Sequence, residues 1–216
     1  MSDPSELSIV DEIRQNILSG FHAPGERLVE AQLTERYAAG RAAVRLALLE
    51  LDKEGLVERS ANRGATVRRI TIAEAIEITE ARAEVEAIIA RYAAVRADED
   101  EKRELVGVID KMRSAVARSD SQEYSDLNRT FHKRLREISK HTVAIELVEN
   151  LRNRASAQQY RISLIPGRTG ESLPEHEAIV DAVVAADPDG AANAMRAHLQ
   201  SVIKVLQSWA AAGLRT

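Results

Sequence analysis

The chain has 216 residues, a length that suits two domains, since domains commonly hold about 100–150 residues. Hydrophobic residues make up 44% and charged residues 30%, which is typical of a soluble globular protein and excludes a largely disordered chain. Cysteine is absent, and this excludes disulfides and thiolate metal sites. The polar opening residues and the lack of a long apolar run predict a cytoplasmic protein with no signal peptide and no membrane partner.

The first seventy residues show helical periodicity followed by a short β pattern. The predicted helices cover residues 5–19, 29–38 and 41–54. The predicted strands cover residues 56–59 and 65–68, with turn-forming residues between them. Helix, helix, turn, helix and β-hairpin is the order of a winged helix-turn-helix. We therefore predict a DNA-binding domain with a small β-hairpin wing over residues 1–70.

From residue 71 onward every predicted element is a helix. The predicted helices cover residues 72–96, 98–118, 121–139, 142–163, 173–186 and 188–209. Ser172 fits the N-cap of the fifth of these helices, with Pro174 in its first turn, and residues 165–170 form a loop before it. We predict an all-α six-helix bundle over residues 71–216, so the chain is mainly α.

Arginines gather at the second and third predicted helices. Arg36, Arg41 and Arg45 lie in a stretch that contains no acidic residue. Arg41 and Arg45 are four residues apart near the start of a helix, where a helix in the major groove reaches base edges. Their guanidinium groups suit guanine or phosphate, and Arg63 at the hairpin tip is placed to meet a minor groove or a phosphate. The alternative is that these arginines only make the surface soluble.

Three predicted helices of the second domain each carry a histidine beside apolar residues. These are His132, His176 and His198, and Asn128 lies one turn before the first of them. Imidazole binds several divalent transition metals, so each of the three helices offers a side chain that can bind a metal. For any single histidine, the alternative is a hydrogen-bonded core residue. His141 is interpreted as a residue near a helix start with no functional role.

Residues 9–69 resemble the winged-helix domain of the GntR family. The matching stretches are Ile17–Gly20, Pro24–Leu28, Leu33–Tyr37, Val44–Arg45, Leu51–Val57 and Asn62–Gly64. The resemblance implies a homodimeric transcription factor that binds double-stranded DNA at a short palindromic operator. The expected DNA-binding residues are Arg36, Arg41, Arg45, Asn62, Arg63 and Gly64.

The chain departs from that family at several positions of the reading helix. Gly40 stands where the family usually has Ser or Thr, and Ala42 and Ala43 stand where it has Thr and Pro. Leu46 replaces a common Glu, and Ala31 replaces a frequent Arg of the second helix. We therefore expect an operator preference that differs from those of relatives.

Residues 72–209 resemble the FCD effector-binding domain of the FadR-type subfamily, in its shorter six-helix form. The resemblance implies a divalent metal ion (zinc, nickel or manganese) and a small organic acid as effector. The expected metal ligands are Asn128, His132, His176 and His198. The family usually has Asp where this chain has Asn128, and a neutral amide oxygen is a weaker ligand than a carboxylate.

Arg82 matches a characteristic arginine of the FCD family and is expected to pair with the carboxylate of the effector. The alternative is a helix-surface ion pair with Glu86, four residues later. Arg154, Arg161 and Ser172 are further candidates for lining the effector pocket.

The sequence thus predicts a ligand-responsive transcriptional regulator, a repressor rather than an activator, and not an enzyme. One alternative is a helical metalloenzyme that uses the histidines, but no nucleophile or free carboxylate stands beside them for general base work. Another is a DNA-binding protein without a ligand, whose second domain only dimerises.

Overall fold

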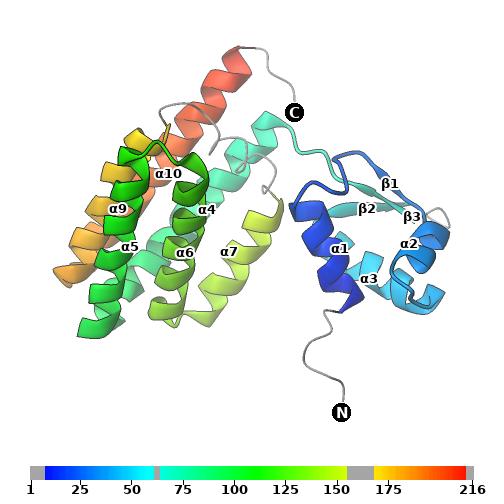
Figure 1. The fold of residues 1–216 in the computed structure, drawn as a ribbon, viewed down its shortest axis with the longest axis horizontal. Helices are drawn as coiled ribbons and strands as arrows, with labels where there is room; N and C mark the ends of the chain where they lie inside the picture. The colour runs from blue at the N-terminus through cyan, green and yellow to red at the C-terminus, as the bar shows by residue number, and fades with distance from the viewer. Residues whose placement is uncertain (1–7, 61–63, 155–167, 213–216) are drawn as a thin grey trace. The chain divides into compact units, whose positions relative to one another are not determined.

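The computed structural model describes residues 8–60, 64–154 and 168–212, which form two compact units that divide between Thr71 and Ile72 (Figure 1). Within these ranges, no helix has the length and apolar character needed to cross a membrane.

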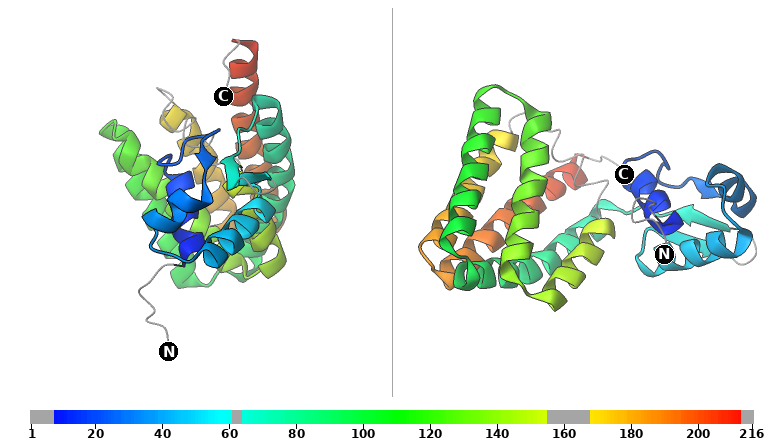
Figure 2. Two further views of the ribbon diagram at one scale, coloured as in Figure 1. Left: turned by 90° about the vertical axis from the view of Figure 1, so that its right-hand side faces the viewer. Right: turned by 60° about the horizontal axis from the view of Figure 1, so that its bottom comes forward.

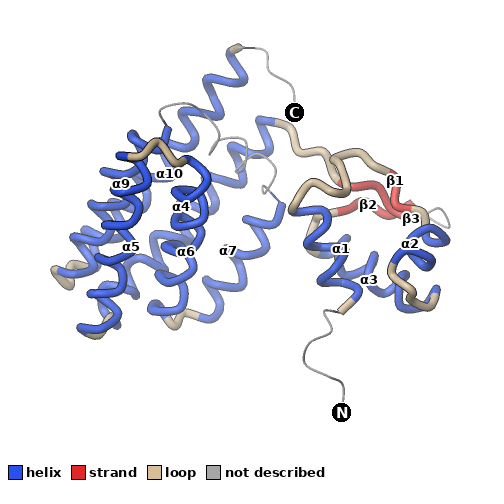
Figure 3. The backbone as a smooth tube through the Cα atoms, viewed as in Figure 1, coloured by secondary structure: helices blue, strands red, loops and turns tan. Residues whose placement is uncertain are grey.

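The first unit combines three helices with a small antiparallel sheet (Figure 3). Its elements are α1 (Ile9–Leu18), β1 (Arg27–Leu28), α2 (Glu30–Arg36), α3 (Arg41–Lys53), β2 (Val57–Ser60) and β3 (Gly64–Val67). The strand order is β1-β3-β2, with both pairings antiparallel. This confirms the predicted winged helix-turn-helix. The sequence analysis missed β1, because two residues are too few for a strand periodicity to be recognised.

One face of α3 builds the core of this unit. Val44, Ala47, Leu48 and Leu51 are buried almost completely, and they pack with apolar residues of α1 and the sheet. Burial of one such large aliphatic side chain contributes about 1.5–3 kcal/mol. The core therefore fixes the rotation of α3 about its axis and decides which residues face outward.

The second unit is a helical bundle, as predicted. Its described helices are α4 (Ile72–Arg96), α5 (Glu99–Ala117), α6 (Ser121–Ser139), α7 (Thr142–Arg154), α9 (Arg168–Val184) and α10 (Pro188–Ala211). The long helix α4 packs along α10 and also contacts α6 and α9, while α5 packs against α6 and α9 (Figure 2). Phe131, Leu135, Ile179 and Met195 are central to the core between these helices.

The prediction for the start of α9 is wrong. The helix begins at Arg168 rather than at residue 173, so part of the expected loop is helical and Pro174 lies inside the helix. Two contacts favour the earlier start: the buried Arg168 pairs with Glu175 two turns later in α9, and Ser172 bonds to Tyr124 of α6 instead of capping the helix. These contacts offset the amide hydrogen bond that the proline cannot make.

Gly64 begins β3 in a backbone conformation that only glycine adopts easily. Its φ is +85°, and a Cβ there would lie 2.1 Å from the carbonyl oxygen of Leu28 in β1. We expect Gly64→Ala to destabilise the first unit by at least about 1 kcal/mol, because it adds backbone strain and separates β1 from β3. Thermal or urea unfolding measures this loss.

Gly20→Ala is the matched control, since Gly20 has a φ of +81° and a Cβ added there would meet nothing within 4 Å. Gly20→Ala therefore has only the free-energy cost of placing an alanine at a positive φ, without a steric clash. Equal losses of stability in the two variants would show that the close approach of β1 to Gly64 is not a constraint.

Candidate functional site

The outward face of α3 presents two arginines beside two apolar residues. Arg41, Ala42, Arg45 and Leu46 occupy the first two turns and are all exposed, on the side opposite the buried Val44. Arg41 and Arg45 are four residues apart, as are Ala42 and Leu46, so the arginines form one row along the helix and the apolar residues form an adjacent row. A helix that enters a major groove uses its N-terminal turns in this way.

The N-terminus of α3 keeps a positive potential. Gly40 is its N-cap and contributes no side-chain oxygen, and the first turn contains no acidic residue. The partial positive charge of the first amides therefore stays uncompensated by a carboxylate in that turn. Arg41 adds a full positive charge there and makes no hydrogen bond or ion pair within the described ranges.

Arg45 is held by a residue that the sequence analysis did not select. Its Nε donates to Oε2 of Glu30, the first residue of α2, at 2.8 Å. The arginine side chain remains 63% exposed, and such a pair contributes no more than about 1 kcal/mol. A phosphate or a base edge can therefore compete with Glu30 for this guanidinium group.

The other predicted DNA-binding residues are less well defined. Arg36 is exposed at the end of α2, with its guanidinium carbon 4.9 Å from the ring centroid of Phe21. Gly64 serves the backbone geometry of the wing, as described above, and its contact with DNA stays a prediction. Asn62 and Arg63 lie outside the described residues.

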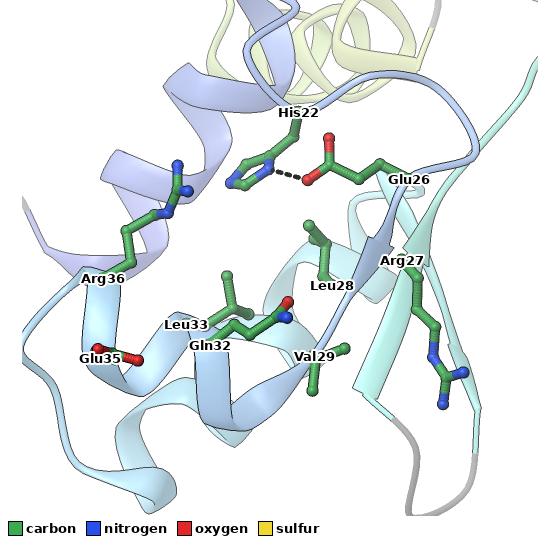
Figure 4. A pocket seen from close by; sticks show the side chains of 9 residues that line it. All are labelled: His22, Glu26, Arg27, Leu28, Val29, Gln32, Leu33, Glu35 and Arg36. Carbon is green, nitrogen blue, oxygen red and sulfur yellow. Dashed lines mark hydrogen bonds and ion pairs between the residues drawn. The ribbon is translucent and has the colours of Figure 1, made fainter.

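A hollow of about 500 Å³ lies between the turn after α1, β1 and α2 (Figure 4). Its lining residues are His22, Glu26, Arg27, Leu28, Val29, Gln32, Leu33, Glu35 and Arg36. His22 is buried, with one ring nitrogen 2.8 Å from Glu26 and the other 3.0 Å from the Tyr37 hydroxyl. These contacts tie the turn to the helices, so His22 has a structural role.

In the second unit, three histidines from three helices meet in the core. His132 comes from α6, His176 from α9 and His198 from α10, and all are at most 5% exposed. Their ligand atoms lie within 4.8 Å of one another, and their ring centroids are 4.5–5.5 Å apart. Small side-chain rotations would bring three nitrogens to bonding distance from one ion, at about 2.0–2.1 Å for zinc.

Each histidine has an outer partner at its Nδ1 atom. Nδ1 of His198 lies 2.8 Å from Glu175, Nδ1 of His176 lies 3.1 Å from the Tyr124 hydroxyl, and Nδ1 of His132 lies 3.4 Å from Glu86. Metal-binding histidines commonly donate their second ring N–H to such a group, which orients the ring and fixes the tautomer.

The charge of Glu175 fixes the direction of one of these bonds. Burial alone would raise the pKa of its carboxyl, but hydrogen bonds from His198, Ser201 and Arg168 outweigh this and lower the pKa to about 2. An ionised carboxylate can only accept, so Nδ1–H of His198 donates to it. The Nε2 atom of His198 is then the one with a lone pair when the ring is neutral.

Two buried polar atoms lack partners and suit a cation, one inside the cluster and one a helical turn before His132 on α6. Nε2 of His176 and Oδ1 of Asn128 have no hydrogen bond within the described residues. Burial, together with the neighbouring His198 and His132, lowers the pKa of His176 well below its usual value, so its imidazole is neutral. A neutral ring nitrogen and an amide oxygen are both metal ligands, so the residues present fit an ion.

The predicted effector-binding residues are distributed unevenly. Arg82 is 4% exposed and donates from Nε and a terminal nitrogen to Oε1 of Glu86, at 2.9 and 2.7 Å. The ion pair considered as the alternative thus exists, but it is buried rather than on the helix surface. Ser172 is buried and lies 2.6 Å from the Tyr124 hydroxyl. Arg154 is the last residue of α7, outside the histidine cluster, and Arg161 lies outside the described residues.

Three residues around the histidines were not selected from the sequence: Tyr124, Arg168 and Glu175. Glu86 was considered only as an ion-pair partner of Arg82, and its contact with His132 was missed. Tyr124 could have been found, because it lies eight residues before His132 and so on nearly the same face of α6. Arg168 could not, because it was assigned to a loop. His141 is outside the cluster, where its Nδ1 accepts from the Ala144 amide at the start of α7.

Family comparisons agree with both units. Residues 6–67 match the profile described as bacterial regulatory proteins, gntR family, and residues 77–201 match the FCD domain. The chain belongs to the gntR family of FCD-containing regulators. The expectation from the sequence is confirmed at this level.

Relatives that align with most of the chain are named as HTH-type transcriptional repressors. The chain is 27% identical over 201 residues to the HTH-type transcriptional repressor RspR of Escherichia coli, covering 93% of this chain and 88% of the relative. It is 26% identical over 203 residues to the HTH-type transcriptional repressor GlaR of Escherichia coli, covering 90% and 92%. This FCD-containing chain is accordingly a transcriptional regulator and not an enzyme.

Solved structures share the fold. Escherichia coli McbR/YncC matches with a TM-score of 0.76 and 21% identity, over 93% of this chain and 95% of that one. A GntR regulator from Rhodococcus sp. RHA1 matches with a TM-score of 0.72 and 22% identity, over 93% and 96%. At these identities the likeness concerns the arrangement of elements in the FCD and winged-helix units.

We expect a divalent metal to stabilise the FCD domain through the histidine cluster. Adding zinc, nickel or manganese to untagged, chelator-treated protein should raise Tm by about 5–10 °C at one hundred times Kd. His176→Ala should abolish the rise, because it removes the partnerless Nε2 from the centre of the cluster. Differential scanning fluorimetry measures the shift, and calorimetric titration gives the stoichiometry.

His141→Ala is the control, because this histidine lies outside the cluster and should leave the metal-induced rise unchanged. A rise of equal size in His176→Ala, or its absence from the unmodified protein with all three metals, would contradict the metal assignment.

Proposed function

We propose that the chain is a homodimer that binds a palindromic operator through the outward face of α3 and responds to a small organic acid held in the FCD domain. The observation that carries the first half is the exposure of Arg41 and Arg45 on one face of a helix whose opposite face is buried. A two-fold symmetric dimer places two such faces on two half-sites, which accounts for a palindromic operator.

The second half of the proposal rests on the buried histidines. His132, His176 and His198 would hold a divalent ion, with the amide oxygen of Asn128 as a fourth, weaker ligand. Such an ion supplies a positive charge and open coordination positions that bind a carboxylate. Because Arg82 pairs with Glu86, and Glu86 lies beside Nδ1 of His132, the arginine supports the position of His132 indirectly. If the effector displaces Glu86, Arg82 becomes the direct partner of the effector carboxylate.

Regulation would follow from differential binding. In one arrangement of the dimer, the two α3 helices do not match both operator half-sites. An acid that binds this arrangement more tightly lowers the affinity for the operator, so the ligand relieves repression. The size of the effect equals the difference in binding free energy, commonly about 1–3 kcal/mol. RspR and GlaR are both named as repressors, and this supports the same direction here.

Substitution of either reading arginine should weaken operator binding. After selection of an operator with the purified full chain, we expect Arg41→Ala and Arg45→Ala each to raise Kd by about 5–150-fold, because each removes a charge-assisted hydrogen bond to a base or phosphate. Fluorescence anisotropy at fixed salt measures the change. The slope of log Kd against log salt concentration should also decrease, by about one for each phosphate that the arginine no longer neutralises.

Arg103→Ala serves as the matched control, because Arg103 is an exposed arginine on α5 that pairs with Asp100. It should leave Kd unchanged. Equal affinities of Arg41→Ala, Arg45→Ala and the unmodified chain for the selected operator would remove the α3 face from the proposal.

Small carboxylic acids should stabilise the metal-loaded protein. At one hundred times its Kd, an acid that binds only the folded state adds about 2.7 kcal/mol to the free energy of unfolding. A thermal-shift screen in metal-loaded and chelated protein identifies such an acid, and the effect should disappear after chelation. If none of the acids stabilises the loaded protein, the effector proposal fails, and a second domain that only dimerises becomes the better account.

A further inference from the structure

We propose that Leu46 reads the C5-methyl group of a thymine in each operator half-site, with Ala42 forming the other side of the contact. This inference rests on the proposed binding of DNA through α3, and it adds a base preference that the arginines do not provide. Its physical basis is the position of one exposed leucine beside the two arginines on the outward face of α3.

The position of Leu46 follows from the helix. It is the sixth residue of α3, four residues after Ala42 and directly after Arg45. Because Val44 and Ala47 are fully buried, Leu46 is rotated away from the core, and it is 63% exposed. Leu46 lies one turn after Ala42, in a row of exposed residues next to the row of Arg41 and Arg45, so it can reach the groove that the arginines approach.

The exposure of a single leucine is not unusual by itself, since much of any protein surface is apolar. What distinguishes Leu46 is its surroundings. It gains little from the core of the first unit, and it stands beside two arginines in the first two turns of a helix. At this position a side chain contributes more to binding than to folding.

The chemistry of the groove identifies the occupant. Among the groups that base pairs display in the major groove, the thymine methyl is the apolar one, and aliphatic side chains contact it. Ala42 is small enough to let the base edge approach, and Leu46 can cover the methyl group from the adjacent turn. Burying one such group contributes about fourfold in affinity.

Charge complementarity favours DNA over an apolar protein partner. Arg41 and Arg45 lie along one side of the Ala42–Leu46 pair, and a protein surface that covered the leucine would have to desolvate both guanidinium groups. In a duplex, phosphates or base acceptors neutralise both arginines, and the C5-methyl group of a thymine can contact the leucine. The outward face of α3 therefore matches a thymine-bearing half-site.

The test compares thymine with deoxyuridine, which lacks only the methyl group. Starting from a selected operator, each thymine is replaced in turn, symmetrically in both half-sites, and Kd is measured by anisotropy with the full chain. We expect one position at which the unmodified protein loses about fourfold per half-site. Leu46→Ala should bind the thymine duplex more weakly and should not distinguish it from the deoxyuridine duplex at that position.

Two further variants complete the experiment. Leu46→Met keeps an apolar side chain and should retain the preference for thymine. Leu147→Ala removes a leucine that is 51% exposed on α7 and should bind both duplexes like the unmodified protein.

The outcomes separate this inference from the function on which it rests. The inference is overturned if no deoxyuridine replacement weakens binding, or if Leu46→Ala keeps the full sensitivity to the methyl group. It is also overturned if Leu46→Ala alters self-association without DNA and leaves the thymine preference intact, since the leucine then serves a protein contact. Failure to select any operator would instead contradict the proposed DNA binding.

Discussion

The structure of the second unit depends on the burial of three imidazole rings in one apolar core. A protonated imidazole is costly to bury, and burial with His198 and His132 close by lowers the pKa of His176 well below its usual value, so this ring is neutral. The three Nδ1 atoms face Glu86, Tyr124 and Glu175, and Nε2 of His176 has no hydrogen bond among the described residues. The divalent cation that we propose would satisfy this nitrogen at the centre of the cluster.

In the first unit the functional side chains are charged and must stay at the surface rather than in the core. The buried side of α3 locks the helix against α1 and the sheet, and this keeps Arg41 and Arg45 at the surface. Glu30 holds Arg45 without burying it, and Gly40 leaves the helix N-terminus free of a side-chain cap. The same rotation exposes Leu46, so one packing constraint determines both the charged and the apolar parts of the reading face.

Much of this architecture could be predicted from the sequence. Periodicity predicted the α3 helix and the two longer strands, and the resemblance to the FCD domain, added to the histidines on three helices, predicted the cluster. The strand β1 is too short for a pattern, and it is recognised only through its pairing with β3. The start of α9 depends on contacts between Arg168 and Glu175 and between Ser172 and Tyr124, which local capping rules do not contain. The outer partners of the histidines likewise arise from tertiary packing, which joins Glu86 of α4 to α6.

The central claim is that a ligand site in the FCD domain changes the affinity of the winged-helix domain for DNA. The most direct measurement is the Kd of one selected operator for the same protein in three states: chelated, metal-loaded, and loaded with both metal and a stabilising acid. The account predicts that the acid weakens binding by about 5–150-fold relative to the metal-loaded state. Identical affinities in all three states, with metal and acid shown to be bound, would contradict it.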